Sequence, residues 1–201
     1  MKRHIVGLSI IILLLFSLPV CAGVPLETVK ANVNKVLEVL RDPKLKAESA
    51  KEIKKEKLRP IYERMFDDVE LSKRTLARNW NSMNVAQRKE FVLLFRQVLE
   101  KAYIDKILAY TDEKIVFDRE TMVSGTQAEI QTKIVTSSNT SSKEIPISYR
   151  VILKGSDWKV YDVVIENVSL VMNYRTQFNN ILAKNTIEHL LETLRKKVKA
   201  Q

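Results

Sequence analysis

The spacing of apolar residues changes twice along the chain, and this change constrains the fold more than any other feature. Up to residue 110, apolar side chains recur every three or four positions, as on one face of an α-helix. Between residues 114 and 165 they alternate with polar ones, as in a half-buried β-strand, and from residue 167 the helical spacing returns. Helices, then strands, then helices are typical of an α+β domain with helices packed on one face of an antiparallel sheet.

The two periods also predict the individual elements. Helices are expected at residues 25–41, 45–66, 68–78, 85–110, 167–183 and 185–198, with an interruption or kink near Pro60 and an N-terminal cap at Asn84. Strands are expected at residues 114–118, 127–136, 144–154 and 158–165. Gly155-Ser156-Asp157 predicts a tight hairpin between the last two strands, so we expect an antiparallel meander of about four strands.

The first 22 residues have the features of a secretion signal. Lys2 and Arg3 precede an apolar run at residues 5–18, and small residues near Ala22 predict cleavage after it. The run is shorter than the roughly 20 residues that a membrane-spanning helix needs. A retained membrane anchor and a lipid-modified Cys21 are the alternatives. We therefore expect residues 1–22 to be a signal peptide and residues 23–201 to form a single exported domain.

Residue types that commonly carry catalysis are scarce. The single cysteine, Cys21, and one of the two histidines lie in the predicted signal, which leaves His189. No metal-ligand spacing, nucleophilic triad or glycine-rich phosphate loop can be assembled, so the sequence predicts no catalytic site, metal site or cofactor. Asp162 is the one candidate: simple alternation puts it on the same sheet face as Trp158, Val160 and Val164. There it could act as a general base with a raised pKa, or form an ion pair with Arg150 or Arg175.

The charge balance points to an anionic partner. The formal net charge is +10, and the predicted signal accounts for two of the positive charges. Nucleic acid, a membrane surface or an acidic protein would suit such a chain, and export argues against nucleic acid. An ordinary solvated helix face is the alternative interpretation of the basic residues.

Several segments together resemble one known family. Residues 68–80 (DVELSKRTLARNW) and 87–95 (QRKEFVLLF) are similar to two of its helices, and residues 146–150 (PISYR) and 158–163 (WKVYDV) to two of its central strands. Residues 166–171 (ENVSLV) and 174–178 (YRTQF) resemble the turn and helix that follow, although Asn167 stands where the family often has glycine. The family is MlaC, also called the toluene-tolerance family, the periplasmic phospholipid-binding component of the Mla ABC transport system. The resemblance runs from about Pro25 to the C-terminus.

The resemblance implies an NTF2-like fold in which a curved sheet and several helices enclose an apolar cavity. It implies a periplasmic carrier, not an enzyme, that holds the acyl chains of a phospholipid as its cargo. Its partners would be an outer-membrane lipoprotein–porin complex and an inner-membrane ABC lipid-transport complex, and its role the maintenance of outer-membrane lipid asymmetry.

Candidate residues for the cavity wall follow from the apolar faces of the long helix, the sheet and the segment after it. They are Phe95, Val98, Leu99, Tyr103, Ile134, Tyr149, Val151, Val160, Val164, Val168, Val171, Met172 and Phe178.

Three rival functions are compatible with the same fold. An isomerase or dehydratase could use Asp162 in a small polar pocket. A carrier could take another apolar molecule, such as a hopanoid or an isoprenoid. An interaction module could have a solid core and no ligand.

Overall fold

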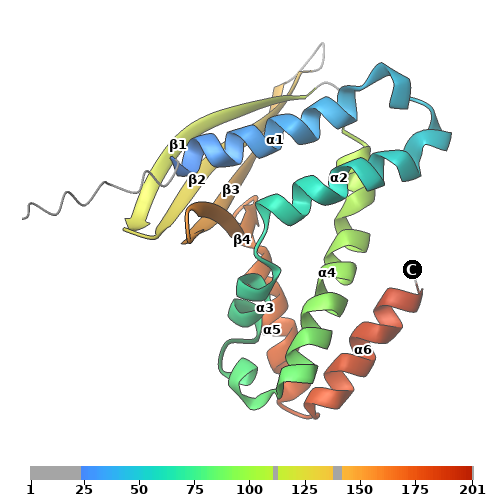
Figure 1. The fold of residues 1–201 in the computed structure, drawn as a ribbon, viewed down its shortest axis with the longest axis vertical. Coiled ribbons are helices and arrows are strands. Elements are labelled where there is room, and N and C mark those ends of the chain that lie inside the picture. The colour runs from blue at the N-terminus through green and yellow to red at the C-terminus, as the bar shows by residue number, and fades with distance from the viewer. Residues whose placement is uncertain (1–23, 111–112, 138–141, 201) are drawn as a thin grey trace, which may run out of the picture.

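Six α-helices and one five-stranded sheet make up the described part of the chain, residues 24–110, 113–137 and 142–200, in a computed structural model (Figure 1). The helices are α1 (Pro25–Arg41), α2 (Lys51–Met65), α3 (Asp68–Leu76), α4 (Val85–Leu108), α5 (Leu170–Leu182) and α6 (Ile187–Ala200). The strands are β1 (Lys114–Ser124), β2 (Gln127–Ser137), β3 (Ser142–Lys154), β4 (Asp157–Ile165) and β5 (Val168–Ser169). The α+β order is confirmed, whereas the predicted signal peptide, residues 1–22, lies outside the described residues.

Local sequence explains where the helices begin. Pro25 occupies the first position of α1, where its missing N–H has no intrahelical acceptor to lose. At the start of α4, the Asn84 side chain accepts a hydrogen bond from the Gln87 N–H at 2.9 Å, and the Gln87 side chain accepts one from the Asn84 N–H at 3.0 Å. This reciprocal capping box confirms the cap predicted at Asn84.

The segment predicted as one helix over residues 45–66 differs in two ways. Two 3₁₀ turns, Pro43–Leu45 and Glu48–Ala50, come first, and α2 begins only at Lys51. The Asp42 side chain accepts from the Lys44 N–H at 2.9 Å and so closes a separate turn before the helix. The expected interruption is absent from this helix, because exposed Pro60 lies inside α2, which continues to Met65.

The sheet is an antiparallel meander in the order β1-β2-β3-β4-β5, which confirms the predicted topology. A two-residue turn joins β3 to β4, with Gly155 at a φ of +62°. A second turn, with Glu166 at +48° and Asn167 at +66°, leads into β5, so the two residues of β5 had been wrongly included in the predicted helix. Strand β1 also runs past its predicted end at Asp118, because a bulge at that residue lets pairing resume at Arg119.

A bulge in β4 overturns the predicted arrangement of its side chains. Arg150 pairs with Asp162 but Val151 pairs with Val160, so Tyr161 is the extra residue. Trp158, Val160, Val163 and Ile165 therefore share one face, with the apolar residues of β3, whereas Tyr161, Asp162 and Val164 share the other. The expectation that Asp162 and Val164 lie beside Val160 was wrong, because strict alternation does not allow for an inserted residue.

We call the face that carries Ala128, Ile130, Tyr149, Val151 and Val160 the inner face, and the opposite one the outer face. Helix α1 crosses the inner face and α2 runs alongside α1, while α3, α4, α5 and α6 form a separate bundle at one end of the sheet (Figure 1). The molecule consequently has two apolar cores, one under α1 and one inside the bundle.

Candidate functional site

The inner face presents a continuous apolar surface across three adjacent strands. Ala128 and Ile130 of β2 pair with Val151 and Tyr149 of β3, and Val151 pairs in turn with Val160 of β4. Ile130 and Val151 are fully buried, beneath Val29, Val33 and Leu37 of α1. We call this set the sheet core; it also contains Met65, Trp158 and Val163.

Two ring side chains of this apolar layer carry a polar atom: the indole nitrogen of Trp158 and the hydroxyl oxygen of Tyr149. The indole Nε1–H of Trp158 is buried and has no hydrogen-bond partner among the described residues. Burial raises the pKa of Tyr149 to about 12, because the phenolate would lose its hydration. The sheet core is therefore apolar with isolated polar groups that can accept or donate a hydrogen bond.

The second set of buried residues, the bundle core, fills the space among α3, α4, α5 and α6. Phe91, Phe95, Tyr174 and Phe178 form its centre, where the Phe95 and Phe178 rings lie 5.3 Å apart and the Phe95 and Tyr174 rings 4.9 Å apart, both edge to face. Burial raises the pKa of Tyr174, in line with a ring that packs inside an apolar cluster.

The residues predicted to line a cavity are divided between these two cores and the surface. Phe95, Val98, Leu99, Val171 and Phe178 belong to the bundle core, and half-buried Tyr103 packs against it. Val151 and Val160 belong to the sheet core, half-buried Tyr149 packs against it, and half-buried Ile134 lies on the same inner face. Val164 is half-buried on the outer face, while Val168 and Met172 are 57% and 49% exposed.

The two cores meet at a junction that we call the seam. Among the described residues, Phe66 and Leu170 are the partly buried apolar side chains that pack against both cores. The backbone crosses here as well, since the Asp67 N–H donates to the Val160 carbonyl at 2.9 Å. Neither Phe66 nor Leu170 was among the sequence candidates, because periodicity shows that a residue is buried but not which of two cores it touches.

Asp162 holds the outer side of this junction together. It is 1% exposed, and its carboxylate accepts from Arg150 Nη1 at 3.1 Å, Ser169 Oγ at 2.6 Å and the Val171 N–H at 3.0 Å. These three donors come from β3, from β5 and from the first turn of α5. The predicted alternative of an ion pair with Arg150 is confirmed, and a carboxylate held by three donors suits a structural clamp better than a general base.

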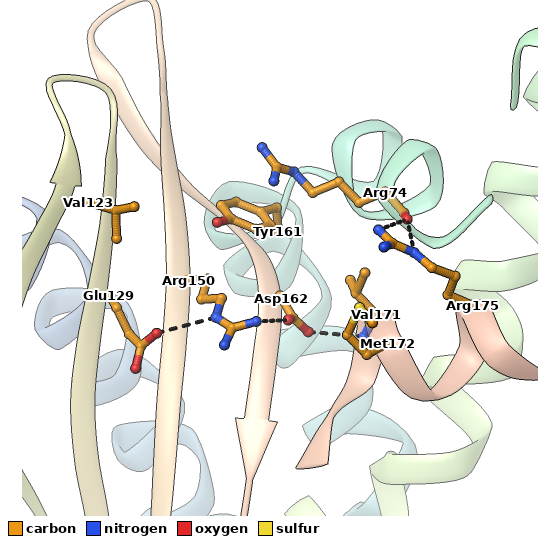
Figure 2. Close-up of a pocket in the computed structure, with 9 residues that line it drawn as sticks. All are labelled: Arg74, Val123, Glu129, Arg150, Tyr161, Asp162, Val171, Met172 and Arg175. Carbon is orange, nitrogen blue, oxygen red and sulfur yellow. Dashed lines mark hydrogen bonds and ion pairs between the residues drawn. The ribbon is translucent and has the colours of Figure 1, made fainter. Parts of the chain in front are cut away.

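Next to this clamp lies a hollow of about 400 Å³ on the outer face, shown in Figure 2. We call it the arginine pocket, because three guanidinium groups line it together with two carboxylates and four less polar side chains. Its residues are Arg74, Val123, Glu129, Arg150, Tyr161, Asp162, Val171, Met172 and Arg175. Another hollow, of about 380 Å³, runs along α1 and is lined by Asn34, Leu37, Glu38 and Arg41. Of the predicted wall residues, only Val171 and Met172 line either of these hollows.

Pairing differs among the three arginines. Arg74 bonds Glu70 Oε1 at 2.8 Å and lies over the Tyr161 ring, 3.9 Å from its centroid. Arg150 bridges Glu129, at 3.3 Å, and Asp162. Arg175 donates to the backbone carbonyl of Arg74 through Nε and Nη2, at 2.9 and 2.5 Å, and no carboxylate of the described residues lies within 4.0 Å of it. The pocket thus holds one half-buried cation without a counter-ion.

Within residues 24–110, 113–137 and 142–200, no group of three or more histidine, cysteine, aspartate or glutamate side chains is placed to hold a metal ion. The helices described there are all too short or too polar to cross a membrane.

Comparison with known proteins gives consistent results. The family model described as MlaC protein matches residues 30–196. The intermembrane phospholipid transport system binding protein MlaC of Haemophilus influenzae is 24% identical over 119 residues, which are 59% of this chain and 56% of that protein. The chain thus matches a little over half of that relative's length.

The fold has a solved counterpart. A phospholipid-binding protein from Ralstonia solanacearum, determined in complex with a phospholipid, superposes with a TM-score of 0.78 at 19% identity, over 89% of this chain and 98% of that one. At this level of identity the likeness establishes the shared fold.

Proposed function

The chain belongs to the MlaC family, and from this premise we propose that it binds a phospholipid by its acyl chains and carries it between membranes. The observation that supports the proposal most directly is the apolar inner face of the sheet, continuous over β2, β3 and β4 and closed by α1. The relatives named above bind a phospholipid or serve intermembrane phospholipid transport, and this chain shares their family or their fold.

Hydrocarbon solvation makes a carrier of this kind necessary. Two acyl chains hold roughly 30 methylenes, so their exposure to water would cost on the order of 24 kcal/mol. A carrier must offer an apolar environment close to that of a bilayer, so that lipid can be loaded and released. The sheet core supplies such an environment, because it is apolar and has few groups that could recognise one head group over another.

We further propose that the acyl chains enter at the seam, by separating the sheet core from the bundle core. Phe66 and Leu170 connect the two cores there, whereas each core is extensively packed within itself. Separation at the seam would first expose Phe66 and Leu170, and the acyl chains would extend from there toward Val160 of the sheet core and Val171 of the bundle core. Of the predicted wall residues, Val160 and Val171 would then lie beside the acyl chains.

We also propose that the protein is exported to the periplasm. There it would carry lipid between an outer-membrane lipoprotein–porin complex and an inner-membrane ABC complex, and so maintain the lipid asymmetry of the outer membrane. Net positive charge would favour acidic docking surfaces on such partners.

Native mass spectrometry of the purified exported protein tests the proposal. We expect the wild-type protein to carry mass corresponding to one phospholipid, identified after extraction. Val151→Glu puts a carboxylate on the inner face, where a buried charge disfavours hydrocarbon, and should remove the lipid. Because Val151 is fully buried, the half-buried Ile147→Glu, on the same face, provides a variant that is easier to fold.

Two further variants serve as controls. Val164→Glu adds the same charge to the outer face of β4, and Val85→Glu adds it at an exposed position at the start of α4; both should retain lipid. Loss of lipid from Val164→Glu alone would assign the cargo to the outer face. A wild-type protein that contains no lipid would contradict the proposed function.

A further inference from the structure

The arginine pocket lies on the opposite side of the sheet from the proposed lipid site, and its construction calls for a separate explanation. Two of its side chains are the extra residues of β-bulges. Val123 falls at the register shift between Met122 and Ser124, and Tyr161 at the shift between Arg150 and Val151. Bulges redirect single side chains and occur often beside functional sites. Here two of them turn side chains toward the same hollow (Figure 2).

Pairing in the pocket leaves one cation without a carboxylate partner among the described residues. Glu129 and Asp162 are both engaged by Arg150, and Arg74 is engaged by Glu70. Arg175 is half-buried and uses one edge of its guanidinium on the Arg74 carbonyl, which leaves Nη1 without a partner among the described residues. A half-buried guanidinium that pairs only with a backbone carbonyl can still form a charge-assisted bond to a carboxylate.

The rim of the pocket is apolar and exposed. Val123 is 66% exposed and Met172 49%, and both border the hollow beside Arg175 and the Arg74–Tyr161 stack. Arginine, tyrosine and methionine are the residue types enriched at the centres of protein–protein interfaces. A pocket with cations inside and apolar side chains at its rim suits a binding segment in which an acidic residue is flanked by apolar residues.

A lipid head group fits this place less well. Acyl chains attached to a phosphate here could reach the seam only from its outer side, where the Asp162 carboxylate binds both the Ser169 hydroxyl and the Val171 N–H. The sheet itself separates the pocket from the apolar inner face.

We propose that the arginine pocket is a docking site for an acidic segment of a partner protein, whose carboxylate pairs with Arg175 while a neighbouring apolar side chain contacts Met172 and Val123. This surface lies on the outer face and adjoins the proposed lipid site at Val171, and the inference holds whichever cargo the protein carries.

Solution NMR of the isotope-labelled, purified exported protein tests this inference. The arginine Nε–H signals are followed while an end-blocked tetrapeptide of alternating glutamate and leucine is added. We expect the Arg175 and Arg150 signals to shift saturably and to return when salt is raised, because screening weakens such contacts. The same peptide with glutamine in place of glutamate should cause no shift.

Three variants sharpen the test. Arg175→Gln should abolish the shift at Arg150, and Met172→Glu should abolish the shifts at both arginines by repulsion at an exposed position. Arg59→Gln, an exposed position of α2, should leave the shifts unchanged. Arg175→Gln should also keep its lipid, which separates docking from cargo binding. No shift at saturating peptide, an equal response to inorganic phosphate, or a response only to phosphatidylglycerol vesicles would each overturn the proposal.

Discussion

A single strained residue ends α3. Ala77 has a φ of +49° and a ψ of −122°, a conformation that a side chain disfavours and glycine adopts freely. Its N–H still donates to the Lys73 carbonyl, and its side chain is exposed. The backbone there is thus fixed by the helix end and the turn that follows, and not by any packing of the methyl group.

Ala77→Gly should therefore stabilise the protein. We expect its free energy of unfolding to rise by about 1 kcal/mol in urea denaturation, because glycine removes the strain. The matched control is Ala102→Gly, an exposed position inside α4, where the same change should cost about 1 kcal/mol. If both variants are destabilised equally, Ala77 is not strained in solution.

Asn167 also adopts a positive φ, and asparagine tolerates this conformation better than alanine does. Its φ of +66° lies in the left-handed region, where glycine is favoured and asparagine is the commonest substitute. The turn between β4 and β5 thus accommodates asparagine in place of glycine at residue 167, and the two strands still pair.

At the scale of elements, Asp162 connects β3, β5 and α5 and so fixes the direction in which α5 leaves the sheet. Asp162→Asn should lower the free energy of unfolding by about 3 kcal/mol, because it leaves Arg150 and buried N–H and O–H donors without a full set of acceptors. The Glu129 carboxylate contacts the same Arg150 from a more exposed position, so Glu129→Gln should lower the free energy of unfolding by under about 1 kcal/mol.

Urea denaturation monitored by circular dichroism measures both changes, and lipid content should be unaffected in each folded variant. A small, equal effect of Asp162→Asn and Glu129→Gln would mean that the three-donor clamp contributes little, and would reopen a chemical role for Asp162.

The elements that sequence predicted well are those with long, regular patterns. Pro25 and Asn84 mark helix starts that the structure keeps, and Gly155 marks the hairpin between β3 and β4. Errors arose at the bulges, since one extra residue at Asp118 or Tyr161 moves every later side chain of the strand to the opposite face of the sheet. For the same reason, Asp162 was predicted on the inner face and lies on the outer one.

The candidate sites differ in how much sequence could reveal. The burial of Val151 and Phe95, two of the residues predicted to line a cavity, was accessible to periodicity. The arginine pocket was not, because Arg74, Arg150 and Arg175 come from three separated segments and meet only through the β4–α5 junction. The seam depends likewise on long-range packing, which no local pattern encodes.

At the scale of the whole molecule, we propose that the two cores can separate at the seam, because few apolar side chains pack against both of them. Each core retains its own buried residues. The connection between them includes Phe66, Leu170 and the Asp67–Val160 hydrogen bond, together with the Asp162–Val171 hydrogen bond and the ion pairs of Lys154 with Asp67 and Glu70. Such a design lets cargo binding act at the seam while α1 and the bundle stay folded.

Removal of lipid should therefore let the two cores close at the seam. Bound ligand at about 100 times its Kd adds about 2.7 kcal/mol to the free energy of unfolding, so extraction should lower the melting temperature. Amide hydrogen exchange should locate the change: the Asp67 N–H, which bonds across the seam, should exchange more slowly once the acyl chains leave, while the Thr75 and Leu191 amides of the bundle should change least. Val151→Glu, as a lipid-free reference, should match the extracted wild type at Asp67. If protection falls evenly over both cores, or only within the bundle, acyl chains do not occupy the seam, because their removal would then disturb some other contact.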